Sequence, residues 1–178
     1  MANHSSSHYP YIGVLGEDLV AKWLQSQGWM VINRRFSCPW GEVDIIAQKK
    51  DDALAFLEVK TRTNGSWDAG GRYTVNYRKH PKIYQTAKMF LVQHPNKADY
   101  LCQFDVAIVC CQPLTEKPIG ATGDENHENK LFSLFTEKYH LFLQEYIPAA
   151  FDASTISGLL SGGNWEKPNY HYRVPMMK

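Results

Sequence analysis

The chain has 178 residues, of which 44% are hydrophobic and 21% are charged. This composition predicts one folded domain rather than a disordered chain, and the length allows a core without disulfide or metal staples. The apolar runs span only about five residues, which excludes a membrane-spanning helix because such a helix needs about 20. The first residues lack a basic flank and an apolar stretch, so we expect no secretory signal. The four cysteines have no Cys-x-x-Cys spacing, so we expect free thiols and a cytoplasmic protein rather than a disulfide framework or zinc site.

Charge is unevenly distributed along the chain. The formal net charge is +1, but residues 28–100 carry twelve Lys or Arg against seven Asp or Glu. The segments before and after this region carry net charges of −1 and −3. A basic middle segment suits a polyanionic partner such as nucleic acid, and it also suits an ordinary solvated face.

The secondary structure is predicted in chain order from periodicity and turn residues. Residues 1–10 indicate a mobile lead-in, and residues 14–27 indicate a helix that Gly28 ends. Strands are expected at 29–36, 42–47 and 53–61, the last two joined as a hairpin by polar residues 48–52. A second helix is expected at 81–94 and a strand covered on both faces at 101–111.

The remaining third of the chain is less regular. Residues 112–130 predict a polar, irregular insertion, and residues 131–135 and 140–147 suit either short strands or a final helix. Gly, Ser, Asn and Pro accumulate over residues 152–178, so we expect a surface tail there. The order αβββαβ predicts an α/β fold with a mixed central sheet flanked by helices, in one domain over residues 11–151.

Charged residues in the predicted hairpin do not fit a purely structural pair of strands. Side chains alternate along a strand, so Glu58 and Lys60 should share one face of theirs. On the preceding strand, Asp44 should point to the opposite face from Val43 and Ile45. The hairpin therefore carries acids and a lysine on faces that packing alone would fill with neutral residues.

The pairing register decides whether these charges meet. If Ala47 faces Ala53 across the loop, Asp44 lies opposite Phe56 and diagonal to Glu58 on the same face. Two carboxylates and one ammonium group then converge at the end of an otherwise apolar hairpin.

Such a cluster suits metal-assisted hydrolysis. Two acids near one point offer hard oxygen ligands for Mg²⁺, which keeps several of its waters. Phosphodiester hydrolysis needs an activated water and a neutralised phosphate, and a bound Mg²⁺ serves both needs. Lys60 would orient the attacking water or stabilise developing charge. The alternative is an ordinary ion pair of Lys60 with Glu58 or Asp44 on a solvated sheet face.

Glu17 adds a third acid from the first predicted helix. On a helical wheel it lies at the edge of the apolar arc, flanking Ala21 and Leu24. From that margin it could meet the end of the sheet that carries Asp44. An acid in the first helical turn also favours the helix dipole, so a purely structural role stays open.

Three blocks of the sequence together form a recognisable set. They are Gly16-Glu17 with Ala21, Gly41-Glu42-Val43-Asp44-Ile45-Ile46-Ala47, and Phe56-Leu57-Glu58-Val59-Lys60-Thr61-Arg62. The set resembles the YraN-like family of predicted endonucleases, which is similar to the archaeal Holliday-junction resolvases within the restriction-endonuclease-like PD-(D/E)xK superfamily. Further residues that fit the family are Val75, Lys79, Ile83, Ala87, Phe104-Asp105-Val106 and the closing segment 147–151.

The resemblance implies a restriction-endonuclease-like αβββαβ core and a metal-dependent nuclease site. Asp44 and Glu58 would bind Mg²⁺, or Mn²⁺ in its place, with the main chain of Val59 as a further ligand. Lys60 would be the catalytic lysine, and Glu17 would be an additional acid that completes the site. The implied partner is DNA, with branched or junction DNA among the candidates. Junction resolution would favour a homodimer, because two symmetric cuts need two sites.

The sequence departs from the family pattern in three places. Gln103 stands where the family usually has Arg, and the insertion at 112–130 is longer than usual. The tail beyond Phe151 has no recognisable counterpart in the family. None of these departures removes a proposed ligand.

Basic residues follow the predicted catalytic strand and suit the phosphates that flank a cleaved bond. They are Arg62, Arg72, Arg78, Lys79 and Lys82. Trp67 and Tyr73 would stack on unpaired bases or pin the loop in place. Two alternatives to a nuclease stay open: a non-catalytic nucleic-acid-binding module on the same scaffold, and a partner-binding protein that uses its acidic C-terminal segment and tail.

Overall fold

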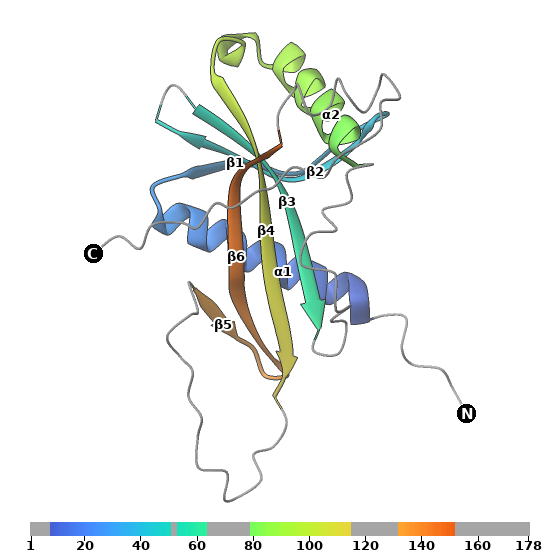
Figure 1. Cartoon of the computed structure of the whole chain (residues 1–178), viewed down its shortest axis with the longest axis vertical. Coiled ribbons are helices and arrows are strands. Elements are labelled where there is room, and N and C mark those ends of the chain that lie inside the picture. Colours follow the sequence, from blue (N-terminus) through green and yellow to red (C-terminus); the bar gives the residue numbers. More distant parts are fainter. Residues whose placement is uncertain (1–7, 51–52, 64–78, 115–131, 152–178) are drawn as a thin grey trace, which may run out of the picture.

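Two α-helices, a short 3₁₀ helix and six strands make up residues 8–50, 53–63, 79–114 and 132–151, which the computed structural model describes (Figure 1). In chain order they are α1 (His8–Ser26), β1 (Met30–Cys38), β2 (Gly41–Lys49), β3 (Ala53–Thr63), α2 (His80–Gln93), η3 (Pro95–Lys97), β4 (Leu101–Pro113), β5 (Ser133–Phe135) and β6 (Tyr139–Phe151). The predictions for most of the 112–130 insertion, for the C-terminal tail and for Trp67, Arg72, Tyr73 and Arg78 lie outside the described residues.

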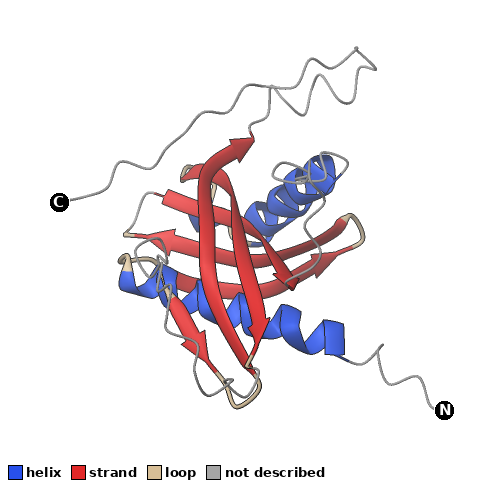
Figure 2. Ribbon diagram, turned by 60° about the horizontal axis from the view of Figure 1, so that its bottom comes forward, coloured by secondary structure: helices blue, strands red, loops and turns tan. Residues whose placement is uncertain are grey.

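The strands form one mixed sheet in the order β1-β2-β3-β4-β6-β5. β3 and β4 run parallel from the pair Ala53–Leu101 to the pair Thr63–Cys111, and every other neighbouring pair is antiparallel. The sheet is strongly twisted, so that β1 and β2 run across β4 and β6 (Figures 1 and 2). The predicted α/β fold with a mixed sheet is confirmed, and the undecided C-terminal segments are strands.

The two helices cover opposite faces of the sheet (Figure 2). α1 packs on one face through Leu19, Val20 and Leu24, and α2 packs on the other through Ile83 and Phe90. The central strands are therefore buried on both sides, which is why β4 has the continuous apolar run that the sequence shows.

The first helix is longer than predicted. It begins at His8 rather than at residue 14, so the end of the predicted lead-in is helical. Pro10 falls in the first turn, where the missing N–H costs nothing because that donor has no partner inside the helix.

The same helix ends at the predicted glycine. Gly28 adopts a left-handed φ of 81° and donates its N–H to the Gln25 carbonyl at 3.1 Å. The next N–H, from Trp29, reaches the Leu24 carbonyl at 3.0 Å. This pair of bonds is a Schellman motif, which satisfies carbonyl groups that a helix end leaves open.

The hairpin of β2 and β3 has a different register from the assumed one. Ala47 pairs with Ala55 rather than with Ala53, and Ala53 pairs with Lys49. β2 therefore extends two residues beyond its predicted end at Ala47. The turn is tighter because Lys50 adopts a left-handed φ of 48°, a conformation that its residue type did not signal.

None of the four cysteines forms a disulfide bond, as predicted, but only two of them are buried. Cys110 and Cys111 are buried in β4, whereas Cys102 is exposed. Neither α1 nor any other helix in the described ranges is long and apolar enough to cross a membrane.

Candidate active site

β2 and β3 separate at the residues that carry the predicted site. The last backbone pair between the two strands is Ile45 with Leu57. If the same register continued, Asp44 would lie opposite Glu58. Instead, Asp44 Oδ2 accepts a hydrogen bond from the backbone N–H of Val59 at 2.6 Å. The carboxylate thus takes the place of a main-chain partner, and a fork opens between the two strands. We call this place, with Asp44, Glu58 and Val59, the strand fork.

The strand fork also exposes a backbone oxygen to Asp44. In an antiparallel ladder, the N–H and C=O of one residue point toward the same neighbouring strand. Because the N–H of Val59 points at Asp44, the carbonyl of Val59 faces the same fork. Among the described residues no hydrogen bond reaches the other carboxylate oxygen, Asp44 Oδ1. The fork therefore presents a free carboxylate oxygen beside a main-chain carbonyl.

The prediction that Val43 and Ile45 share one face of β2 is wrong. Val43 packs with Ile46 in the cluster under α2, whereas Ile45 packs in the cluster under α1. Val43 and Ile45 thus lie on opposite faces, because the strand rotates where its pairing with β3 ends. The predicted position of Asp44 opposite Phe56 is also wrong, because it followed from pairing Ala47 with Ala53, and in the structure Phe56 pairs with Ile46.

Glu58 is buried and surrounded by positive charge. Its side chain is 6% exposed, and its Oε1 accepts hydrogen bonds from the ammonium groups of Lys60 and Lys79, the second at 2.9 Å. Burial acts to raise the pKa of Glu58, but its bonds to both lysines outweigh burial and hold that pKa below its ordinary value. The sequence predicted Lys60 here, while Lys79, predicted as a phosphate contact, is an ion-pair partner of Glu58.

Asp44 has the opposite electrostatic environment. Burial raises its pKa to about 6, and the nearby negative charges of Glu58 and Glu17 add to the rise. The Val59 hydrogen bond and the charge of Lys60 oppose it without cancelling it. The three predicted acids and the predicted lysine thus influence one another, and Asp44 forms no ion pair within the described part of the chain.

Glu17 reaches the site from α1 and is fully engaged by arginine. Its carboxylate accepts hydrogen bonds from Arg35 Nε and Nη2, both at 2.9 Å, and Arg34 approaches at 3.5 Å. Arg34 also donates to Asp18 at 2.6 Å. The sequence analysis did not predict a role for either arginine. The signal that could have indicated one was the presence of two adjacent cations in an otherwise ordinary strand.

A close approach between α1 and β3 brings Glu17 to this position. A Cβ atom added to Gly16 would lie 1.8 Å from Thr61 Oγ1, so only glycine fits there. The residue after Gly16 is Glu17, and the residue before Thr61 is Lys60. The contact therefore sets the helix-borne acid beside the strand that carries the lysine.

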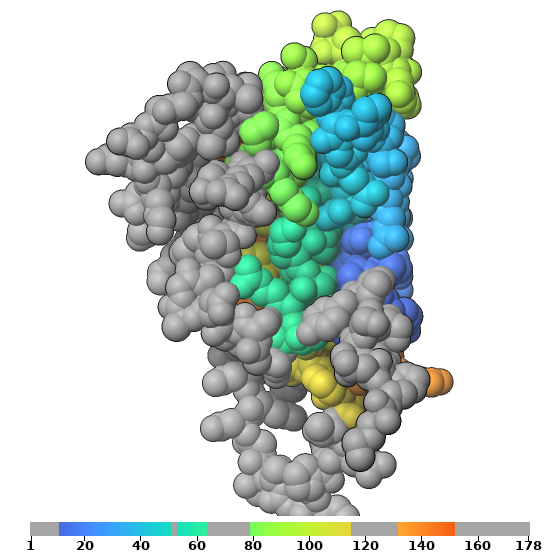
Figure 3. All heavy atoms as spheres, turned by 90° about the vertical axis from the view of Figure 1, so that its right-hand side faces the viewer, coloured from blue at the N-terminus to red at the C-terminus, as the bar shows by residue number. Residues whose placement is uncertain are grey.

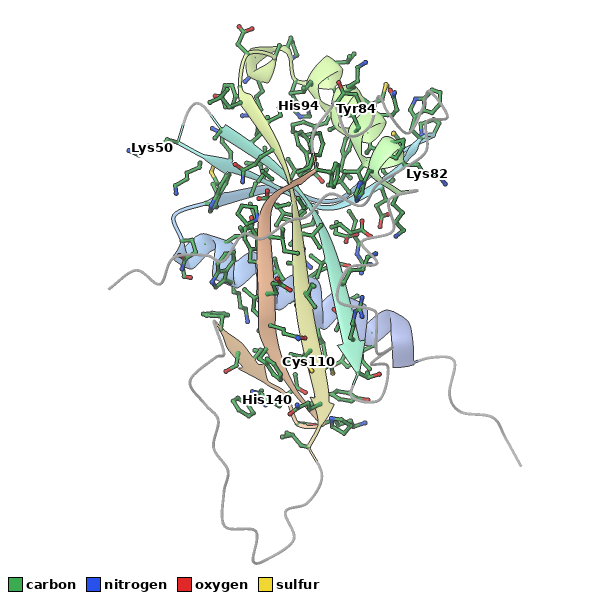
Figure 4. The ribbon with its side chains drawn as sticks, viewed as in Figure 1. Lys50, Lys82, Tyr84, His94, Cys110 and His140 are labelled. Atoms are coloured by element: carbon green, nitrogen blue, oxygen red, sulfur yellow. The ribbon has the colours of Figure 1, made fainter. Side chains whose placement is uncertain are left out.

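The other predicted DNA contacts lie around the same face. Figure 3 views the side of the molecule where β3 lies between α1 and the start of α2. Lys82 is exposed and points outward from the first part of α2 (Figure 4). Arg62 is partly exposed on β3. The two predicted arginines between β3 and α2 lie outside the described residues.

His80 was not predicted, and it lies at the start of α2. It is buried, and its ring stacks on Phe151 with centroids 3.8 Å apart. Neither ring nitrogen has a hydrogen-bond partner among the residues that the structure describes. Burial lowers the pKa of His80 to about 4, although the charge of Glu58 acts in the other direction. A buried imidazole without partners destabilises the fold relative to an apolar ring of the same shape.

Replacing His80 by Phe is therefore expected to raise the free energy of unfolding by about 1–2 kcal/mol at pH 7, because the stack stays and the unsatisfied nitrogens go. The gain should grow from pH 6.5 to pH 4.5, because the unfolded chain protonates His80 in that window while the folded protein keeps it neutral. Urea denaturation at both pH values measures this. His80→Ala is the control and should lower stability through loss of the stack. A less stable His80→Phe protein would mean that the nitrogens have partners.

The donor atoms at the strand fork suit a hard divalent cation. Within residues 8–50, 53–63, 79–114 and 132–151, no group of three or more His, Cys, Asp or Glu side chains could hold a metal ion by itself. Mg²⁺ does not require such a cage, since it binds through one or two carboxylates and retains water. Asp44, Glu58 and the carbonyl of Val59 provide that number and type of oxygen ligands.

Comparison with known proteins places this site inside a matched region. The model of the "Uncharacterised protein family UPF0102" matches residues 16–109. A UPF0102 protein of Nostoc sp. is 50% identical over 145 residues, which cover 79% of this chain and 94% of that protein. UPF0102 proteins of Synechocystis sp. and Trichodesmium erythraeum are 42% and 40% identical, over 79% and 78% of this chain and 97% and 87% of their own lengths. The strand fork, Glu17, Lys60 and Lys79 all fall within the matched residues.

Proposed function

The chain belongs to the UPF0102 family, as its YraN-like resemblance predicted, and we propose that it is a Mg²⁺-dependent endonuclease that hydrolyses phosphodiester bonds in DNA. The observation that carries the proposal is the strand fork, where the Asp44 carboxylate takes the place of a main-chain partner and the charge of Glu58 acts on it. A structural sheet has no use for an acid whose pKa is raised by its own burial and by the charges of two neighbouring acids.

Each residue of the site has a role in this proposal. Asp44, Glu58 and the carbonyl of Val59 would hold the ion, which activates a water and neutralises phosphate charge when bound. Lys60 and Lys79 neutralise Glu58 in the absence of an ion. Lys60 would orient the attacking water and stabilise charge that develops on the phosphate. Glu17 adds negative charge from α1.

The surroundings of the site support a polyanionic substrate. Lys79 and Lys82 lie at the start of α2, and Arg62 lies on β3 beyond Lys60. Arg72 and Arg78 belong to the same part of the sequence. These cations would bind phosphates on either side of the cleaved bond. We expect the enzyme to act in the cytoplasm, and as a homodimer where its substrate is a four-way junction.

The test is cleavage of duplex, single-stranded and four-way-junction DNA with Mg²⁺ or Mn²⁺. Lys60→Ala is expected to lower the cleavage rate by about 10²–10³-fold, the usual effect of removing one charge-stabilising group from a reacting centre. Lys88→Ala, at an exposed position farther along α2, is the matched control and should keep full activity. Equal rates for the wild type and Lys60→Ala would contradict the role of Lys60, and no cleavage of any substrate would contradict the nuclease.

One observation favours a second candidate, a nucleic-acid-binding module without catalysis. The described residues already neutralise two of the three acids, Glu58 by lysines and Glu17 by arginines. A protein that never loads a metal would need this compensation. Tight DNA binding that needs no metal, stays unchanged in Glu58→Ala and leads to no cleavage would favour this candidate.

A further inference from the structure

Arg35 and Glu17 form a contact that a metal ligand would not be expected to have. Each oxygen of the Glu17 carboxylate accepts one N–H of the Arg35 guanidinium, at 2.9 Å. This two-bond geometry is the strongest pairing available between the two groups. Only 10% of the Glu17 side chain is exposed, so water has little access to its carboxylate oxygens. An ion bound by Glu17 would lie beside the positive charges of Arg35 and Arg34, which oppose its binding.

The backbone at Arg35 is unusual as well. Arg35 has a φ of 51°, in the left-handed region that residues with side chains rarely adopt. Such conformations cluster at functional sites, where the surrounding structure holds them. The pairs Arg34–Ile45 and Phe36–Val43 flank this position, which sets Arg35 across from Asp44. The conformation thus directs a long cation toward the acidic end of the strand fork.

The guanidinium keeps binding capacity beyond Glu17. It has five N–H donors, of which the two bonds to Glu17 use two. The described residues provide no partner for Nη1, and the Arg35 side chain is 48% exposed. The negative charges of Glu42 and Asp44 also act on Arg35. A fixed, planar cation with open donors beside a hydrolytic centre is suited to a phosphate group.

We propose that Arg35 binds a phosphate of the nucleic acid at the α1 side of the strand fork, and that Glu17 is a positioning residue that holds Arg35 rather than a metal ligand. The proposal rests on the proposed function for its substrate, DNA. It separates the three predicted acids into two kinds. Asp44 and Glu58 serve the ion, and Glu17 serves the phosphate through its arginine.

The test compares metal binding with DNA binding in the same variants. Mn²⁺ affinity is measured by electron paramagnetic resonance, and affinity for a labelled duplex by fluorescence anisotropy, with Ca²⁺ in place of Mg²⁺. Glu17→Gln should leave the Mn²⁺ dissociation constant within about twofold and weaken DNA binding about threefold to tenfold, because the arginine loses a charged partner. Arg35→Gln should weaken DNA binding about tenfold or more. Lys22→Gln, an exposed position on α1, is the control for loss of one positive charge.

Two further variants keep the test decisive. In Arg35→Gln protein, adding Glu17→Gln should weaken DNA binding no further, because Glu17 acts through Arg35. Arg35→Lys keeps the charge but lacks the planar fork, so its DNA affinity should still fall well below that of Lys22→Gln. It serves in place of Arg35→Gln if that protein does not fold. Mn²⁺ affinity that falls tenfold in Glu17→Gln, or DNA affinity in the Arg35 variants equal to that of Lys22→Gln, would overturn the proposal.

The same measurements test the proposed nuclease activity separately from the role of Arg35. If the wild type binds duplex DNA through Arg35 but binds no Mn²⁺ and cleaves nothing, the nuclease proposal fails and the assignment of Arg35 stands. If Mn²⁺ binds, cleavage occurs and the Arg35 variants bind DNA as the control does, the nuclease stands and the assignment of Arg35 fails.

Discussion

Asp44→Asn should lower both Mn²⁺ affinity and the cleavage rate by about 10²–10³-fold. It removes the negative charge that would bind the ion, and the ion would in turn stabilise the charge that develops on the phosphate. The shape of the site should survive, since the Asn amide oxygen can still accept the Val59 N–H that Asp44 accepts at 2.6 Å. Cleavage assays and Mn²⁺ binding measure the loss. Full activity of Asp44→Asn would remove the strand fork from the mechanism.

The same substitution is expected to stabilise the metal-free protein. Because the pKa of Asp44 is raised to about 6, the folded state binds its proton more tightly than the unfolded chain does. The free energy of unfolding therefore falls as pH rises from about 4 to about 6, and the full cost, about 1–3 kcal/mol, is present above that window. Asp44→Asn lacks this cost, so it should exceed the wild type in stability at pH 7 and approach it at pH 4.

Urea denaturation in the presence of EDTA at pH 4, 5, 6 and 7 measures this difference. Asp99→Asn, which changes an exposed acid, is the control and should follow the wild type at every pH. A difference between the wild type and Asp44→Asn that does not change with pH would contradict the raised pKa of Asp44. A gain in stability combined with a loss of activity is typical of residues retained for function.

Gly16→Ala is expected to lower the free energy of unfolding by about 1–3 kcal/mol, the usual cost of overpacking a buried contact. The added methyl group would lie 1.8 Å from Thr61 Oγ1, so α1 or β3 must shift. Because Glu17 and Lys60 adjoin the two contacting residues, cleavage should fall as well. Thermal unfolding and the cleavage assay measure the two effects.

The helix provides its own control for this substitution. Apart from the adjoining residues of α1, the described part of the chain places no atom within 4 Å of the Cβ added in Gly13→Ala, so this variant should raise stability by up to about 1 kcal/mol through helix propensity alone. Thr61→Ala should partly rescue Gly16→Ala, since it removes the clashing hydroxyl and leaves the Thr61 Cβ at 3.1 Å. Equal stabilisation by Gly13→Ala and Gly16→Ala would show that α1 does not approach β3 so closely.

Periodicity predicted most of the scaffold, because burial imposes it directly on the sequence. The apolar stripe of α1, the alternation of Phe56 and Leu57 between two clusters and the continuous apolar run of β4 all follow from which faces are covered. The charged residues Asp44 and Glu58 were found for a related reason. They interrupt strands that are otherwise apolar, and such exceptions mark functional sites.

The register and the arginine were beyond sequence reasoning, because both depend on backbone conformations that residue type does not announce. Lys50 and Arg35 have left-handed φ angles without being glycine. The Lys50 conformation accompanies a hairpin in which Ala47 pairs with Ala55 rather than Ala53, and the Arg35 conformation accompanies the pairing of its guanidinium with Glu17. Only the packed structure selects such conformations, since each is disfavoured locally.

The role of Lys79 was missed for a different reason. It is distant from Glu58 in the sequence, and only the position of α2 against the sheet brings the two together. A lysine just before a helix is equally suited to binding a phosphate, so the residue type alone did not indicate an ion pair with Glu58. His80 was missed because a histidine that packs like an aromatic ring gives no pattern of its own.

The glycine contact between α1 and β3 bears on how quickly the protein responds to its ligands. With no room for a methyl group at Gly16, helix and strand are in van der Waals contact and offer no hinge between them. The groups left free to rearrange are long exposed side chains, such as that of Lys82. Rotamer changes of exposed side chains take picoseconds to nanoseconds, far faster than domain closure. If the proposed ion binds, diffusion and dehydration of the ion, rather than induced fit of the backbone, would then set the rate of its binding.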